Sequence, residues 1–188
     1  HSAERKRKVE WKYWEKQKEN RIMARDENVK IFQVTEKQVK EDPKLQEAVK
    51  RSVAEQILIP EVMEVADLMP ELARNRDRYE QDAEIIVSKK RSYEAAARYP
   101  GEKVCVHNFA SATNPRGGVT KGSSAQEECL CRCSTLYFCL NTKEMWDGFY
   151  SPHRYAQDPI HNDDCIYTPG VIVFKSDTAA SGKFNHRL

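Results

Sequence analysis

The feature that most constrains the fold is a glycine-rich loop, which joins a segment typical of a strand to a segment typical of a helix. Residues 103–111 alternate apolar and polar side chains, and residues 123–141 form an apolar, helix-prone run. Gly117, Gly118 and Gly122 lie between them, and glycine adopts positive φ without a steric penalty. We therefore expect a tight strand–loop–helix connection at this place.

The elements before the loop predict an α/β alternation. Residues 84–88 are typical of a short strand, and Ser92 is expected to cap a helix that ends at Pro100 and Gly101. A second strand over 103–111 follows, and the glycine loop comes directly after it. Ligands of open α/β sheets bind at the carboxyl ends of strands, which makes this loop a candidate ligand site.

The rest of the chain predicts helices with short strands between them. Residues 3–25 predict a charged helix and residues 28–34 a short strand. A capping box at Thr35 predicts a helix start, and Pro43 is expected to open another helix at its first turn. A last strand is expected over 170–176.

Composition indicates a single domain. The chain has 188 residues, 39% of them hydrophobic, and a net charge of +2, so no overall field points to nucleic acid or membrane. It has neither a membrane-length apolar run nor a secretory leader, and we expect a cytoplasmic protein. The six cysteines lack paired zinc-ligand spacing and are interpreted as reduced thiols; a metal site or a disulfide is the alternative.

The glycine loop matches neither common phosphate-binding pattern. A P-loop needs a Lys followed by Ser or Thr after its last glycine, and the dinucleotide fingerprint needs another glycine spacing. Two interpretations stay open: a loop that approaches a ligand closely, or an ordinary strand–helix connection. Glu127 and Glu128 lie in the first helical turn, about 100° apart, so at most one of them faces the loop.

The central motif resembles the signature of the microbial-type poly(ADP-ribose) glycohydrolases. That signature is a strand ending in N-F-A, then N-P-G-G-G, a spacer, and Q-E-E at the start of a helix. This chain has "NFA" at 108–110, "NPRGG" at 114–118 and "QEE" at 126–128. The resemblance extends over nearly the whole chain beyond the N-terminal arm.

The resemblance implies a macrodomain-like mixed sheet between helices, with an N-terminal helical extension and an incomplete sheet. Residues 1–27 would form the charged arm, and 28–188 the first two-thirds of the domain. The implied activity is hydrolysis of the ribose–ribose bond of poly(ADP-ribose), without metal or cofactor, with Glu128 catalytic and Glu127 holding the ribose. The implied substrate-binding residues are Asn108, Phe109, Ala110, Asn114, Gly117, Gly118, Val119 and Gln126.

Two departures from the family pattern bear on activity. Arg116 replaces the first of the three glycines, and a positive φ there would cost about 1 kcal/mol; its side chain would reach a phosphate or close the site. The expected last part of the sheet is also missing, so we expect self-association or a complementing chain at the open edge. The alternative function is an ADP-ribose-binding module or an inactive, truncated homologue. The expected partners are poly(ADP-ribose) or ADP-ribosylated proteins.

Overall fold

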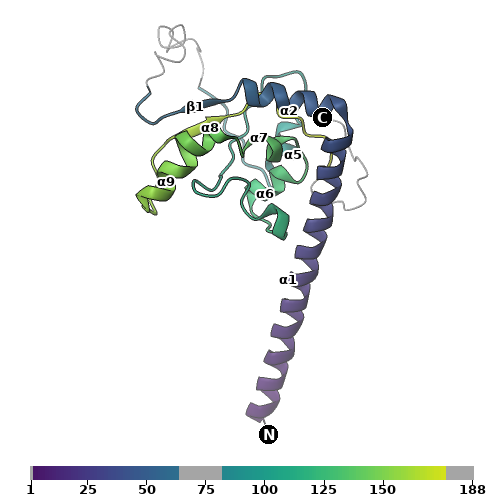
Figure 1. Cartoon of the computed structure of the whole chain (residues 1–188). Helices are drawn as coiled ribbons and strands as arrows, with labels where there is room; N and C mark the ends of the chain where they lie inside the picture. Colours follow the sequence, from purple (N-terminus) through teal and green to yellow (C-terminus); the bar gives the residue numbers. More distant parts are fainter. Residues whose placement is uncertain (1, 64–81, 177–188) are drawn as a thin grey trace.

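The computed structural model describes residues 2–63 and 82–176 of the chain. The elements are α1 (Ser2–Glu41), α2 (Pro43–Ala54), β1 (Ile57–Ile59), α5 (Ser92–Ala96), the 3₁₀ turn η1 (Val119–Lys121), α6 (Gln126–Cys131), α7 (Leu136–Cys139), α8 (Lys143–Met145), the π-helical turn η2 (Trp146–Tyr150), α9 (Ser151–Ala156) and β2 (Cys165–Tyr167). Helix α1 projects from a body that the other elements form (Figure 1).

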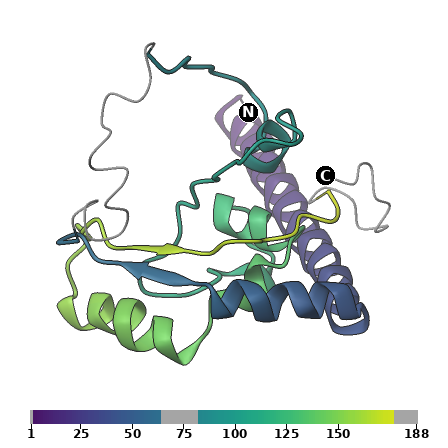
Figure 2. The same ribbon diagram turned by 90° about the horizontal axis from the view of Figure 1, so that it is seen from above.

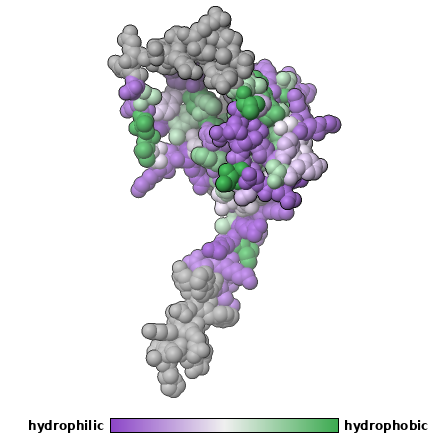
Figure 3. Space-filling model, turned by 90° about the vertical axis from the view of Figure 1, so that its left-hand side faces the viewer, coloured by the Kyte–Doolittle hydropathy of each residue, from purple (hydrophilic) through white to green (hydrophobic). Residues whose placement is uncertain are grey.

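Helix α1 is continuous over 40 residues, so the strand predicted at 28–34 is wrong. Ile31, Phe32 and Val39 are buried, and together with Thr35 they recur on one helical face that lies against the body. Thr35 does not begin a helix; its buried hydroxyl bonds the carbonyl of Arg132 within the body. The other end of α1 projects away, and its described surface is mainly hydrophilic (Figure 3).

Helix α2 begins as predicted, and it leads into the two-stranded sheet. Asp42 is its N-cap and accepts a hydrogen bond from the backbone N–H of Lys44 at 2.8 Å, with Pro43 at the first helical position. Strands β1 and β2 then pair antiparallel, with Leu58 opposite Ile166, as Figure 2 shows from above. Both of these side chains pack against the cluster of Met145, Phe149 and Tyr150.

Three further strand predictions are wrong in the described part of the chain. Residues 84–88 and 103–111 are extended, but neither segment is paired as a strand. Residues 170–176 make only an isolated bridge, between Val173 and Ser134. A strand needs a neighbour to satisfy its backbone groups, and alternating side chains alone do not supply one.

The helix predicted over 123–141 is divided into α6 and α7. The segment around Val173 inserts its backbone groups at the division: Thr135 N–H donates to the Ile172 carbonyl at 3.0 Å, and Phe174 N–H donates to the Cys133 carbonyl at 3.1 Å. These bonds replace the helical ladder at that point. The contact comes from residues nearly 40 positions away, so local sequence does not indicate it.

The core contacts the glycine loop through Val119. Its main cluster contains Phe32 from α1, Val119 from η1, and Leu130, Cys131, Leu136 and Leu140 from the α6–α7 region. None of the six cysteines, all of which lie in the described ranges, is part of a disulfide, and Cys131, Cys133 and Cys139 are buried. Among the described residues, no helix combines the length and the apolar composition needed to span a membrane.

Candidate active site

The glycine loop is a tight turn with an arginine in a position that favours glycine. Gly117 N–H donates to the Asn114 carbonyl at 3.1 Å, which closes a four-residue turn. Pro115 occupies the second position of the turn, and Arg116 occupies the third with φ of 72°. These are the features of a type II turn, whose third position prefers glycine or asparagine. Arg116 therefore has the positive φ, and with it the backbone strain, that its place in the family pattern suggested.

Backbone amides of the loop hold the two glutamates that begin α6. Arg116 N–H donates to Glu127 Oε1 at 3.0 Å, and Ser111 N–H donates to Glu127 Oε2 at 3.2 Å. Gly118 N–H donates to Glu128 Oε1 at 2.8 Å. The two residues are only 3% and 7% exposed. The loop therefore fixes the direction in which each carboxyl group points, and the prediction that at most one of the two glutamates faces the loop is wrong, because the loop bends around both.

One oxygen of this pair is different from the other three. Glu128 Oε2 is buried and has no hydrogen-bond partner among the described residues, whereas both oxygens of Glu127 and the other oxygen of Glu128 accept backbone amides. A buried polar atom without a partner costs free energy, and such atoms are uncommon in folded proteins. Glu128 Oε2 is therefore the one oxygen of the pair that no backbone amide engages.

The two glycines are required by close approach to these groups. A Cβ added at Gly117 would lie 2.3 Å from Glu128 Oε1, and one at Gly118 would lie 2.3 Å from Ser123 Oγ. Gly117 also has φ of 54°, which disfavours any larger residue. The loop backbone therefore lies directly on the Glu128 carboxyl group.

Burial controls the protonation of Glu127. Removal from water raises the pKa of Glu127 above its ordinary value of 4.5, and the neighbouring Glu128 carboxylate raises it further. The amides of Ser111 and Arg116 stabilise the charged form and oppose this rise. The loop and the interior therefore act on this carboxyl group in opposite directions.

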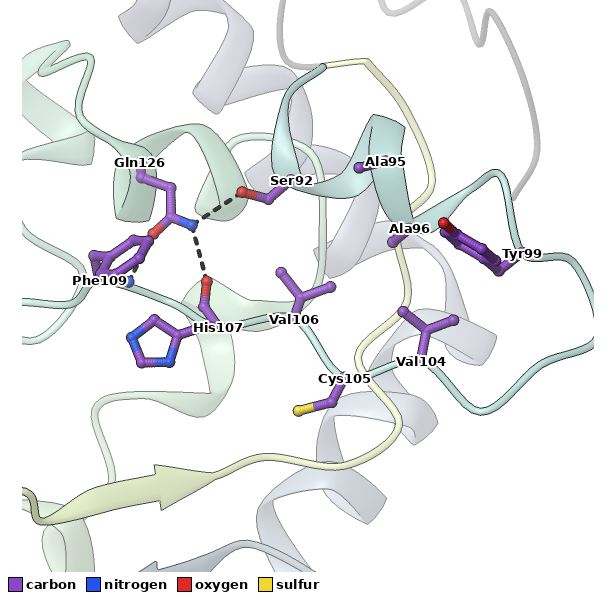
Figure 4. A pocket seen from close by; sticks show the side chains of 10 residues that line it. All are labelled: Ser92, Ala95, Ala96, Tyr99, Val104, Cys105, Val106, His107, Phe109 and Gln126. Atoms are coloured by element: carbon purple, nitrogen blue, oxygen red, sulfur yellow. Dashed lines mark hydrogen bonds between the residues drawn. The ribbon is translucent and has the colours of Figure 1, made fainter. Parts of the chain in front are cut away.

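Gln126, the first residue of the motif, connects three segments. Its Oε1 accepts the Phe109 N–H at 2.6 Å, and its Nε2 donates to the His107 carbonyl at 2.8 Å and to Ser92 Oγ at 2.9 Å. Figure 4 shows the two bonds from Nε2. Ser92 thus accepts a hydrogen bond from Gln126. The prediction that Ser92 caps α5 is wrong, because Arg91 is the N-cap residue.

The other predicted binding residues differ in how far their side chains are exposed. Phe109 is 74% exposed and Ala110 is exposed beside it. The Asn108 Oδ1 atom is buried without a hydrogen-bond partner in the part of the chain that the structure describes. Asn114 is exposed and donates from Nδ2 to the Gly117 carbonyl at 3.0 Å. The side chain of Val119 packs in the main core cluster, next to the glycine loop.

Some residues of the site were not expected from the sequence. Ser111 supplies an amide to Glu127, and its hydroxyl accepts the Asn114 N–H at 3.0 Å. A serine three residues before a turn asparagine is a local signal for such a bond. Asn28 of α1 donates to the Gly122 carbonyl at 3.0 Å, and no local pattern indicates a contact across 94 positions.

An open cavity of about 360 Å³ lies beside Gln126, between α5 and residues 104–109 (Figure 4). Its lining is mostly apolar, and its polar members include Ser92, His107 and Gln126. Within the described ranges, no three His, Cys, Asp or Glu side chains are grouped as metal ligands would be.

The fold and the site define an α/β domain whose glycine loop holds a buried pair of carboxyl groups. A family model described as the microbial-type PARG catalytic domain matches residues 15–176, and the chain belongs to this family. The resemblance to this family that the sequence motif indicates is thereby confirmed. A comparison with curated proteins gives no match.

Solved structures of poly(ADP-ribose) glycohydrolases are similar to this chain. The enzyme of Thermomonospora curvata is 26% identical with a TM-score of 0.61, over 85% of this chain and 60% of that one. Its complex with the inhibitor ADP-HPD is 29% identical with a TM-score of 0.60, over 80% and 56%. The Deinococcus radiodurans enzyme with ADP-ribose is 30% identical with a TM-score of 0.58, over 74% and 53%.

These similarities confirm the predicted fold class, including the incomplete sheet. The chain spans between 53% and 60% of the length of these relatives.

Proposed function

We propose that the chain hydrolyses the ribose–ribose O-glycosidic bond of poly(ADP-ribose) and releases ADP-ribose, with Glu128 as the acid and base. The observation that carries the proposal is the unpartnered Glu128 Oε2 atom, beside a neighbouring carboxyl group whose oxygens both accept amides. Family membership and the named activities of the similar structures support the same substrate.

One carboxyl group is sufficient for this chemistry. The Glu128 carboxylic acid donates its proton to the leaving ribose oxygen as the bond to the anomeric carbon breaks. The resulting carboxylate then removes a proton from a water molecule, whose oxygen bonds to the anomeric carbon. The products are two free hydroxyl groups, and Glu128 is again protonated.

Glu127 is proposed to hold the substrate ribose. Each of its oxygens already accepts one amide and retains a second lone pair, which accepts a ribose hydroxyl. Gly117 and Gly118 contribute by close approach, because their amides are engaged by Asn114 and Glu128. The remaining residues of the proposed site are Asn108, Phe109, Ala110, Asn114, Val119 and Gln126.

The proposed partners follow from the substrate and are poly(ADP-ribose) chains or ADP-ribosylated proteins. We propose that residues 1–27 are an arm separate in function from 28–188, although α1 runs through this boundary. The exposed apolar segments around Ile85 and Val104 are the proposed place for self-association or for a complementing chain. A cytoplasmic location is proposed with them.

The test is ADP-ribose release from a poly(ADP-ribosyl)ated protein by the chain and by Glu128→Gln. Gln keeps the size of the side chain but supplies no acidic proton, and we expect a loss of at least roughly 100-fold. Glu144→Gln, at an exposed position of α8, is the matched control and should retain the native rate. Equal rates for the native chain and Glu128→Gln would contradict the proposal.

An ADP-ribose-binding module is the alternative that Arg116 favours, because the arginine restrains a loop that covers the Glu128 carboxyl group. Calorimetry with ADP-ribose separates the two functions. Binding without release from the polymer would support the module, and release that depends on Glu128 would support the hydrolase.

A further inference from the structure

We propose that Arg116 is a positioning residue, which holds the glycine loop and the Glu127 carboxyl group in place by stacking its guanidinium on the Tyr137 ring. The proposal deepens the proposed function and rests on it wherever activity is the readout. It concerns a residue in which this chain departs from the glycine of the family pattern.

The backbone of Arg116 is in a conformation that its side chain opposes. Its φ is 72°, and it precedes Gly117 with φ of 54°, so two consecutive residues are left-handed. Glycine and asparagine adopt this conformation more readily than arginine does. Such a conformation persists only where surrounding contacts enforce it. The contacts of Arg116 must therefore stabilise the loop more than those of a glycine would.

The side chain supplies such a contact. The Arg116 guanidinium carbon lies 4.1 Å from the centroid of the Tyr137 ring, within the range of a cation–π stack. Its Nε atom is buried and has no hydrogen-bond partner among the described residues. The planar face of the guanidinium, rather than a directed hydrogen bond from Nε, is therefore what anchors this side chain.

The platform under the guanidinium is itself fixed. The Tyr137 ring lies 4.5 Å from that of Phe32 in α1 and 5.1 Å from that of Phe138, measured between centroids. Tyr137 also packs against the main core cluster. The stack thus ties the loop to the interior of the body.

The anchored residue is the one that donates to Glu127. Arg116 N–H bonds Glu127 Oε1 at 3.0 Å, and two positions later Gly118 N–H bonds Glu128 Oε1 at 2.8 Å. Motion of the turn at Arg116 would loosen both bonds, because the two amides belong to one short loop. Glycine here would relieve strain and lose the anchor.

The experiment uses two single variants and their combination. Arg116→Asn keeps the backbone N–H and tolerates positive φ but lacks the guanidinium, and Tyr137→Leu removes the ring. Tyr137→Phe retains the ring and is the matched control for Tyr137→Leu. Thermal unfolding of each variant verifies that it is folded before the measurement. If Tyr137→Leu does not fold, the comparison of Arg116→Asn with the separate Tyr137→Phe variant tests the role of the guanidinium.

We expect each single variant to lower kcat roughly three- to tenfold with little change in KM, because carboxyl orientation matters in the transition state. The double variant should be no worse than the lower single variant, since both remove one contact. A raised KM with unchanged kcat would instead assign Arg116 to phosphate binding and overturn the proposal. Additive losses, or no loss at all, would also overturn it.

A second readout does not depend on activity. The Arg116 amide lowers the pKa of Glu127, so loosening the loop should raise that pKa in Arg116→Asn and Tyr137→Leu, but not in Tyr137→Phe. Carbon-13 NMR of the Glu127 carboxyl group over a pH titration measures it. An inactive native chain would contradict the proposed function, while unchanged titration in both variants would contradict the role of Arg116.

Discussion

Residues 107–140 and residues 82–106 carry equally clear sequence patterns, yet they are built differently. The first region has a buried polar network around Glu127 and Glu128 over the main core cluster. In the second region, Ile85 is 89% exposed and Val87 is 93% exposed, and the extended segments have no strand partner in the described structure.

The difference lies in the distance along the chain to each partner. The bonds to Glu127 and Glu128 from Ser111, Arg116 and Gly118 cross only 10 to 16 positions. A short loop closes such contacts at low entropic cost. Strand pairing of an apolar segment needs another strand to supply its hydrogen bonds and to cover its side chains. The site is thus assembled from local sequence, and the sheet is not.

The largest expected difference between the two regions concerns apolar burial. Leu130→Ala removes a side chain from the main core cluster and should lower the free energy of unfolding by about 2–5 kcal/mol. Val87→Ala, at a solvated position of the other region, should change it by less than about 0.5 kcal/mol. Urea unfolding of both variants measures this. A comparable loss for Val87→Ala would mean that its segment is covered in solution.

The second comparison concerns two glycines with positive φ. Gly117→Ala places a methyl group against the Glu128 carboxyl and should lower kcat roughly 100-fold, because displacement of a reacting group by about 1 Å costs this much. A Cβ at Gly101 meets nothing within 4 Å, and Gly101→Ala should lose only about 1 kcal/mol of stability to strain. Steady-state kinetics and thermal unfolding separate the two effects. Equal kinetic losses would show that contact with Glu128 does not explain Gly117.

The smallest comparison concerns two acidic residues. Glu127→Gln replaces an acceptor oxygen with a donor, leaves a buried amide of Ser111 or Arg116 unpaired, and should cost about 1–3 kcal/mol near pH 4. Glu102→Gln, at an exposed position, should cost almost nothing. Thermal unfolding of both variants in acidic buffer measures this.

The stability difference between the native chain and Glu127→Gln should depend on pH in a definite direction. The pKa of Glu127 is raised on folding above 4.5, so the folded protein binds the proton more tightly than the unfolded chain. The stabilisation that this tighter proton binding gives is complete below pH 4.5, and it is lost as the pH rises through the pKa of Glu127 in the folded protein. The stability advantage of the native chain over Glu127→Gln should therefore shrink with rising pH. An advantage that grows over this range would contradict the raised pKa.

Local chemistry alone was sufficient for several parts of the molecule. Asp42 and Pro43 start α2 as predicted, because capping needs only neighbouring residues. The glycine loop before the acidic pair, the family and the fold class were also recognised from sequence. The family pattern has glycine at the position of Arg116, and this is a local sign of the left-handed backbone found there. The roles of Glu127 and Glu128 remain predictions.

Other features depend on contacts between distant residues, which no local pattern contains. Residues 28–34 alternate like a strand but stay helical, because the face containing Phe32 packs on the body. Backbone bonds from the segment around Val173 divide the predicted long helix into α6 and α7.

The sequence by itself determined that the glycine loop comes just before the acidic pair, because both belong to one short stretch of the chain. It did not determine that loop amides donate to both glutamates. Only the tertiary structure decided which oxygen of Glu128 stays without a partner and where the Arg116 side chain lies. Those two outcomes depend on burial and on a ring held by α1, and burial is a property of the whole packed chain.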